Sequence, residues 1–155
     1  MCISSNWIKC HEADCNDARG RIEGLDRSFD LQFWQSQTPR YTKNLDLWIS
    51  TDSQNASAVY LALQQFGAPL NGLTQSDFSE DGFFYQMGVP PERVDILMGI
   101  PGVQFSEAWE RRETVWFDDL PVFFISRQDL ITAKRSSGRP QDLIDADLLS
   151  QSTET

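Results

Sequence analysis

Three oxygen-bearing side chains at strand-like positions are the residues most able to do chemistry in this chain. The segment TKNLDLWIS (42–50) carries Asn44 and Asp46 two places apart, and RVDIL (93–97) carries Asp95 between two apolar residues. Residues i and i+2 of a strand point to the same side, so Asn44 and Asp46 should share a face. Hard cations such as Mg²⁺ prefer oxygen ligands, and such a site would serve phosphoryl or nucleotidyl transfer. If the two strands are neighbours, Asp46 and Asp95 converge on one site.

The acid within the apolar strand also has a simpler interpretation. A buried carboxylate is costly unless it is paired, solvated or bound to a cation. Asp95 can instead face water, or pair with an arginine such as Arg93 or Arg40. Spacing alone leaves this interpretation open beside the metal site.

The elements that must position these acids follow from periodicity and from turn residues. Alternation predicts strands, and helical spacing with caps predicts helices. The predicted strands cover 42–50, 82–89, 92–100, 113–117 and 121–125, and the predicted helices cover 53–66, 105–112, 127–135 and 140–149. Strands and helices do not alternate regularly in this order. The sequence therefore predicts an α/β (α+β) fold, with a small mixed β-sheet and helices packed mainly on one face.

Composition and charge narrow the classes of function. The chain has 155 residues, 40% of them hydrophobic, and a formal net charge of −10. This suits one domain with a core, and it argues against a broad electrostatic grip on nucleic acid or on an anionic membrane. The first residues, MCISSNWIKC, have no apolar core of signal-peptide type, so a cytoplasmic protein is expected.

Three segments carry a resemblance to a known family. They are PRYTKNLDLWIS (39–50), VPPERVDILMGIPGVQFSEAWERR (89–112) and PVFFISRQDLITAKRSSGRPQDLIDADLL (121–149). In this order they resemble three blocks of the nucleotidyltransferase superfamily with a DNA-polymerase-beta-like fold. The resemblance is to a small bacterial branch related to AbiEii-type toxins of toxin–antitoxin systems, and it covers roughly residues 39–149.

The resemblance implies roles for particular positions. Asp46 and Asp95 match catalytic acids that hold Mg²⁺ together with the residue at position 44. Lys134 matches a helix lysine that meets the triphosphate. Arg139 and Asp142 match the family's RPKD element, of which Arg139 is assigned to the nucleotide site. For Arg139 and Asp142 a role at a helix junction is the open alternative. The implied reaction transfers a nucleotidyl group from an NTP to a hydroxyl of RNA, a protein or a small molecule, and an antitoxin is an implied partner.

Two departures from the family pattern predict an impaired site. Asn44 stands where the first acid belongs, which removes one negative charge from the expected metal site. The family's strand ending in Gly-Gly or Gly-Ser is missing, because no glycine lies between Gly24 and Gly67. The alternative function is therefore a non-catalytic or degenerate nucleotidyltransferase-fold protein with a binding or regulatory role.

The chain divides into an atypical segment 1–37, a nucleotidyltransferase-like domain 38–150 and a frayed tail 151–155. The segment 1–37 is expected either to be disordered or frameshifted, or to be a diverged terminus. In the second case its alternating residues Phe29 to Phe33 form a strand that completes the sheet.

The N-terminal segment also holds the few soft metal ligands of the chain. Cys2, Cys10, His11 and Cys15 could support a zinc-bearing interaction module, although their spacing is irregular. An incidental cluster is the other interpretation.

Overall fold

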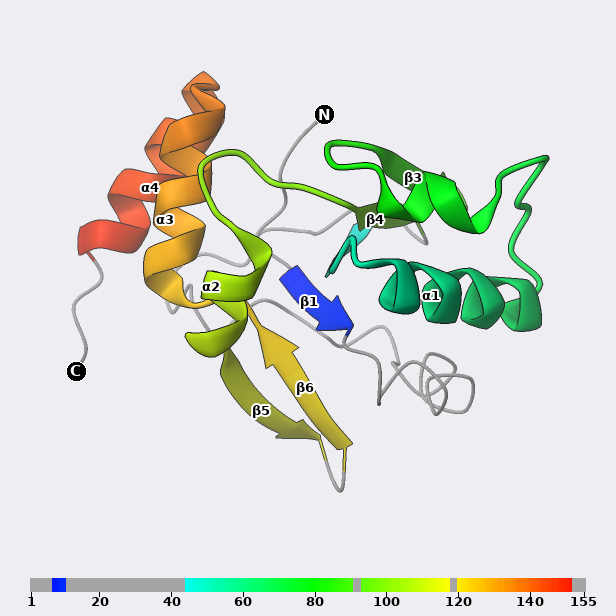
Figure 1. The fold of residues 1–155 in the computed structure, drawn as a ribbon. Helices are drawn as coiled ribbons and strands as arrows, with labels where there is room; N and C mark the ends of the chain where they lie inside the picture. The colour runs from blue at the N-terminus through cyan, green and yellow to red at the C-terminus, as the bar shows by residue number, and fades with distance from the viewer. Residues whose placement is uncertain (1–6, 11–43, 91–92, 118–119, 152–155) are drawn as a thin grey trace.

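The computed structural model describes residues 7–10, 44–90, 93–117 and 120–151 (Figure 1). Within them, strands and helices follow one another in the order β1, β2, α1, η3, β3, β4, α2, β5, β6, α3, α4. The strands are β1 Trp7–Cys10, β2 Asn44–Ile49, β3 Phe84–Met87, β4 Arg93–Leu97, β5 Glu113–Phe117 and β6 Leu120–Phe124. The helices are α1 Ser53–Phe66, the 3₁₀ helix η3 Gln75–Ser79, α2 Phe105–Glu110, α3 Arg127–Ser137 and α4 Pro140–Gln151. The mixed α+β class predicted from the sequence is confirmed.

The strands form one six-stranded mixed sheet in the order β3-β4-β2-β1-β6-β5. β2 is parallel to both of its neighbours, β1 and β4, whereas the β3–β4, β1–β6 and β5–β6 pairs are antiparallel. β2 therefore lies inside the sheet, which is where an isolated carboxylate is hardest to hydrate.

β1 is a strand that the sequence did not predict. It lies between β2 and β6, where Ile8 pairs with Leu47 on one side and with Phe124 on the other. Four residues of the segment set apart as 1–37 thus belong to the same sheet as the rest of the fold. The strand expected at 29–33 and the proposed zinc ligands Cys2, His11 and Cys15 lie outside the described residues.

The sheet is covered by helices on both faces, so the expectation of helices mainly on one face is wrong. Ile49 and Ile96 pack with α1 and with Phe78 of η3 in one core cluster. Trp48, which alternation places on the opposite side of β2, packs with residues of α2, α3 and α4 in a second cluster. Figure 1 shows α1 and the pair α3–α4 at opposite sides of the strands. Trp48 lies on the face of β2 that also carries Asp46, and it is 1% exposed.

Local capping chemistry fixes the helix boundaries close to where the sequence predicts them. The carboxylate of Asp52 accepts from the backbone N–H of Asn55, and Gly67 ends α1 with a left-handed φ of 85°. Ser126 caps α3 through the N–H of Asp129, and Pro140 is the first residue of α4.

Candidate functional site

The two acids singled out from the sequence lie side by side in the middle of the sheet. β2 and β4 are hydrogen-bonded neighbours, and their parallel register pairs Asp46 directly with Asp95. Neighbouring strands lie about 4.8 Å apart, so the two side chains leave the backbone at that separation on one face. Asp46 is 2% exposed and Asp95 is 5% exposed. The condition under which the two acids would converge, that their strands are neighbours, is met, and we call this pair the acid rung.

Asp95 is bound by two side chains from the edge of the sheet. The amide of Gln86 on β3 donates to Oδ1 of Asp95 at 2.9 Å, and the guanidinium of Arg93 donates to Oδ2 at 2.9 Å. Gln86 is the antiparallel partner of Asp95, and Arg93 lies two residues before it on the same strand, so both face the acid by the alternation of their strands. The alternative that Asp95 pairs with Arg93 is confirmed.

This arrangement does not fit a divalent ion at Asp95. Each oxygen of this carboxylate already accepts a hydrogen bond, and one of the donors is a cation that neutralises its charge. Mg²⁺ at Oδ2 would compete with the guanidinium of Arg93 for that oxygen. Among the residues that the structure describes, no cluster of three or more His, Cys, Asp or Glu side chains is placed to hold a metal ion.

Asn44 occupies the position next to this ion pair in the sheet. Its Cα is the register partner of Arg93, two residues before the acid rung on both strands. The backbone therefore brings positions 44, 46, 93 and 95 to one patch of two adjacent strands. The side chain of Asn44 lies outside the described part of the chain.

Lys134 lies in a different part of the molecule, between α3 and α4. Its side chain has no exposed surface, and its amine lies 3.4 Å from Oδ1 of Asp142 and 3.0 Å from Oδ2 of Asp145. The other oxygens of these acids accept from Ser137 and Gln141 at 2.7 and 3.0 Å. Asp142 and Asp145 are themselves buried, at 3% and 5% exposure. The junction role considered for Asp142 is the one that the contacts support.

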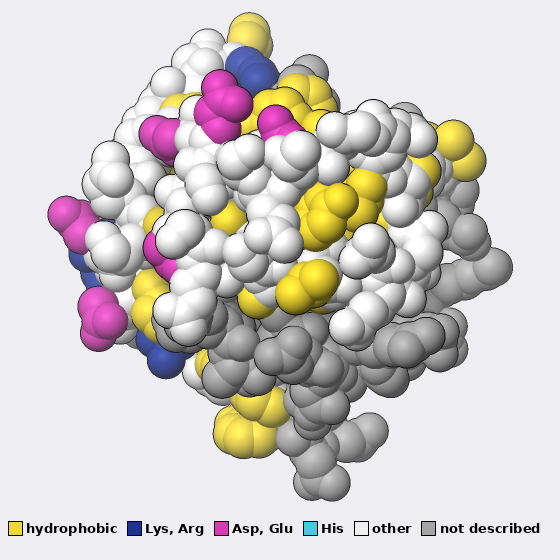
Figure 2. Space-filling view, turned by 45° about the vertical axis from the view of Figure 1, so that its right-hand side comes forward, with side chains coloured by type: hydrophobic (Ala, Val, Ile, Leu, Met, Phe, Trp, Pro, Cys, Tyr) yellow, Lys and Arg dark blue, Asp and Glu magenta, His cyan; other side chains and the backbone are white. Residues whose placement is uncertain are grey.

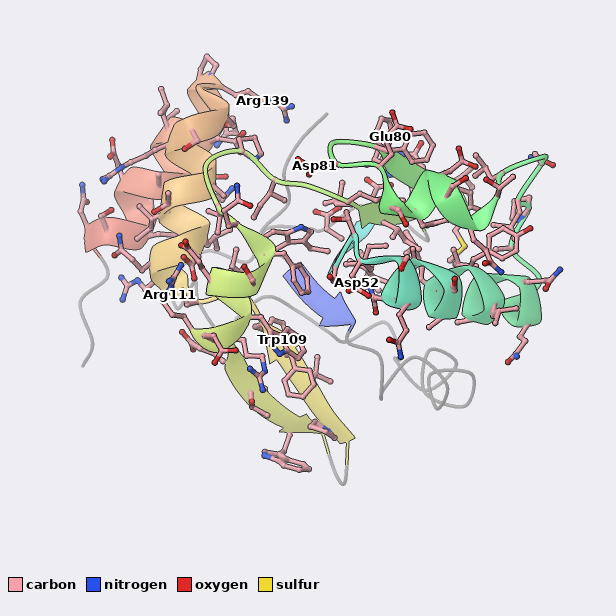
Figure 3. The ribbon with its side chains drawn as sticks, in the orientation of Figure 1. Asp52, Glu80, Asp81, Trp109, Arg111 and Arg139 are labelled. Atoms are coloured by element: carbon pink, nitrogen blue, oxygen red, sulfur yellow. The ribbon has the colours of Figure 1, made fainter. Side chains whose placement is uncertain are left out.

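Arg139 does not join the acid rung either. It is exposed at the turn between α3 and α4, from which its side chain projects in Figure 3. Of the five positions assigned to the site from the sequence, the sheet unites Asn44, Asp46 and Asp95, and the helix pair carries Lys134 and Arg139. The sequence missed Gln86, whose only signal is a polar residue between the buried Tyr85 and Met87 of β3.

A second ion pair joins α2 to the start of α3. Arg111, labelled in Figure 3, donates two hydrogen bonds to the carboxylate of Asp129, at 3.2 and 2.8 Å. Hydrogen bonding to Asp129 raises the pKa of the Arg111 guanidinium. Asp129 also accepts from the hydroxyl of Ser126 at 2.7 Å. These bonds anchor the N-terminus of α3 and explain why an acid is buried there.

Aromatic rings of the chain itself fill the space beside α2. Phe105 meets Trp48 edge to face at 5.1 Å and stacks on Trp109 at 5.9 Å between ring centroids. The ring centroids of Trp109 and Phe123 lie 5.2 Å apart. The guanidinium of Arg112 lies 4.2 Å from the ring centroid of Trp109. This row of rings packs α2 onto the same sheet face as Trp48.

The surface matches the acidic composition. On the face drawn in Figure 2, acidic side chains are scattered and basic side chains are few. No described helix combines the length and the apolarity needed to cross a membrane.

No family model, no curated protein and no solved structure matches this chain. Its resemblance to nucleotidyltransferases therefore stays a prediction from the three sequence segments.

Proposed function

We propose that this protein is a nucleotidyltransferase-like domain in which transfer from an NTP to a hydroxyl is impaired. The observation that supports the proposal most is the acid rung. Two residues chosen as catalytic acids from separate sequence segments are direct partners in adjacent parallel strands. Two carboxylates buried this close repel one another unless cations compensate them, which is a common arrangement where phosphate chemistry takes place.

Three features support the impairment. Asn44 replaces the acid that the family pattern places two residues before Asp46. Arg93 and Gln86 already bind both oxygens of Asp95. The amine of Lys134 is held by two acids inside the helix pair and has no exposed surface with which to meet a triphosphate. The implied reaction therefore lacks the acid expected at position 44, and the Asp95 carboxylate and the Lys134 amine that it would use are both bound within the chain.

A second candidate is a non-catalytic protein of this type, with a binding or regulatory role such as that of a partner in a toxin–antitoxin pair. The binding of both Asp95 oxygens within the chain supports it. Under this alternative the domain neither transfers nor tightly binds a nucleotide.

The test separates nucleotide binding from nucleotide transfer. Each of the four NTPs, with Mg²⁺, is titrated into the protein by calorimetry, and α-labelled NTPs are then supplied with total RNA and with the protein itself as acceptors. We expect weak binding that Asp46→Asn abolishes, and transfer that Asn44→Asp raises at least about tenfold, or about 1.4 kcal/mol in barrier. Asp147→Asn, at an exposed acid of α4, is the matched control.

Two outcomes would contradict the proposal. If wild type and Asn44→Asp both fail to bind any Mg²⁺–NTP, the non-catalytic candidate takes its place. If Asp46→Asn binds and transfers like the control variant, any activity belongs to another site.

A further inference from the structure

β5 lies at one end of the six-stranded sheet. Among the strands that the structure describes it has a neighbour on one side only, β6, so its outer backbone groups have no partner within that sheet. Figure 1 shows the β5–β6 hairpin extending away from the helix pair α3–α4. Proteins usually block such an edge with charges, prolines or bulges, because it is a template for another strand. The sequence of β5, ETVWF, contains one charged residue and no proline.

One face of β5 presents a large apolar side chain to solvent. Trp116 is 65% exposed, although an indole ring offers more apolar area for burial than most side chains. Thr114 is also exposed, and alternation places it on the same face. Arg112 belongs to this face as well, because its guanidinium lies 5.1 Å from the ring centroid of Phe123, the register partner of Thr114. A cation, a hydroxyl and an exposed indole therefore follow one another along this edge.

The charges on the two sides of β5 are opposite in sign. Two arginines precede the strand at 111–112, and two aspartates follow it in the sequence at 118–119. Arg111 is bound to Asp129 within the chain, whereas Arg112 donates to the carbonyl of Trp109 at 2.6 Å and makes no ion pair with the residues that the structure describes. The strand thus has a positive beginning and a negative end, which suits antiparallel pairing with a second copy of itself.

A two-fold axis at Val115 gives such a pairing a definite register. Val115 then lies opposite Val115 of the second copy, and Thr114 lies opposite Trp116. The two Trp116 rings become diagonal neighbours, a separation that aromatic side chains can bridge. One step further out, position 112 meets position 118, an arginine against an aspartate, at both ends of the paired strands. Opposite charges across an antiparallel pair stabilise it, and this register puts no like charges opposite each other.

We propose that the outer edge of β5 is a self-association surface, at which two copies of this protein pair antiparallel about Val115 and join their sheets. The contact is isologous, so it closes at the dimer. An edge of five residues is short beside interfaces of standard size, so we expect a Kd of the order of 10 μM. The proposal involves neither the acid rung nor a nucleotide, and it holds or fails independently of the proposed function.

The first test measures the mass of the full-length protein by sedimentation velocity, at concentrations from well below to well above that Kd. We expect wild type to change from monomer to dimer over this range. Trp116→Lys places a charge on the open edge and should raise the Kd at least about tenfold. Circular dichroism should show an unchanged fold, because Trp116 is mostly exposed. Wild-type protein that stays monomeric throughout would overturn the proposal.

Charge reversal at the two ends of β5 tests the register. Arg112→Glu and Asp118→Arg each put like charges at both ends of the paired strands, so each alone should weaken dimerisation at least about tenfold. An equimolar mixture of the two should dimerise like wild type, because each reversed residue then meets its opposite. General repulsion between chains of net charge −10 predicts a different result. In that case Asp118→Arg, which is less negative, would dimerise more tightly than wild type.

Arg135→Glu and Asp147→Arg are the matched controls, because they make the same charge changes at exposed residues outside β5. Alone or mixed, they should leave the Kd within about twofold of wild type. An equal response of these controls, tighter association of Asp118→Arg, or a mixture of folded variants that stays monomeric would overturn the proposal. If circular dichroism shows that Arg112→Glu is unfolded, Asp118→Arg and Trp116→Lys decide alone. A wild-type dimer whose Kd neither of them changes uses another surface.

Discussion

At the scale of single residues, Lys134 is the most consequential side chain outside the sheet. It carries a positive charge with no exposed surface, and it is compensated by two acids that are also hydrogen-bonded to Ser137 and Gln141. Removing one member of a buried ion network leaves uncompensated charge, which costs more than the network contributes to stability. Lys134 therefore holds α3 against α4, and this role differs from the triphosphate contact that the family resemblance implies.

The two roles of Lys134 predict different results for Lys134→Met. As a buried counter-ion, its loss should lower the free energy of unfolding by about 3–5 kcal/mol in urea denaturation. Adding Asp142→Asn and Asp145→Asn should restore much of that loss, because the amides keep hydrogen-bonding capacity without charge. Arg135→Met, at the next and exposed position, should change stability by no more than about 0.5 kcal/mol. A stable Lys134→Met protein that has lost only nucleotide affinity would support the triphosphate contact instead.

At the same scale, the sequence predicted contacts within one strand better than contacts between helices. The sequence offered Arg93 and Arg40 as partners for Asp95, and Arg93, two residues before it on the same strand, pairs with it. The partners of Lys134 are eight and eleven residues away, across the turn between α3 and α4. No periodicity of a single helix brings such positions together, so only the packing of two helices reveals this network. The pairing of Asp46 with Asp95 also depended on which strands are neighbours, and the sequence could state it only as a condition.

At the scale of elements, capping side chains and left-handed glycines set where the helices begin and end. Helix α1 begins after the cap Asp52 and ends at the left-handed Gly67. Helix α3 begins after the cap Ser126 and ends at the left-handed Gly138. Each of these residues is adjacent in sequence to the helix that it delimits. These signals can therefore be read from the sequence. β1 could not, because its four residues become a strand through pairing with β2 on one side and β6 on the other.

The single-turn helix η3 supplies a prediction for acid pH. Oδ2 of Asp77 accepts from the backbone N–H of Thr74 at 2.5 Å and from its hydroxyl at 2.8 Å. The backbone bond from Thr74, with its side-chain bond, lowers the pKa of Asp77 below its ordinary value of 3.8. A lowered folded-state pKa means that the stabilisation is fully present above the unfolded pKa. It is lost as the pH falls below about 3.8, through the lower folded-state value.

The measurement compares Asp77→Asn with wild type by thermal unfolding between pH 2 and pH 7. We expect the variant to be less stable near neutral pH, and the difference to shrink as the pH falls through the acid range. Asp147→Asn provides the comparison at an exposed acid. A difference that stays constant over the whole range would show that the charge of Asp77 does not matter for this cap.

At the scale of the whole molecule, two groups of elements can be distinguished. Residues 44–98 form one half of the fold, and β5, β6, α2, α3 and α4 form the other half. Ile49 belongs to the core cluster of the first half, while Trp48 belongs to that of the second. β1 joins the halves within the sheet, because it is hydrogen-bonded to both β2 and β6. The sequence predicted one small mixed sheet with helices mainly on one face. That prediction fails at Trp48, which is buried against α2, α3 and α4 on the second face.

A proline in β1 should weaken both halves at once. Ile8 pairs with Leu47 and Phe124, and Ile8→Pro removes a backbone donor in the middle of the sheet. We expect a loss of at least about 2 kcal/mol in the free energy of unfolding, from the lost bond and the strained neighbours. Hydrogen exchange should accelerate in β2 and β6 together.

Ile8→Val, which keeps the N–H and the branched side chain, is the control for this variant. It should cost no more than about 1.5 kcal/mol. Wild-type stability and exchange rates in Ile8→Pro would show that β1 contributes little to holding the sheet together.

The place of β1 also sets the order in which the fold can be completed on the ribosome. β1 is translated first, but one of its two partners, β6, emerges only after β2, β3, β4 and β5. Until then β1 can pair on one side only, and its other edge stays open to wrong partners. Closing the sheet requires a contact across most of the chain, which is the kind of step that slows folding. The last strand pairing, between Ile8 and Phe124, should therefore limit the rate at which newly made chains escape aggregation.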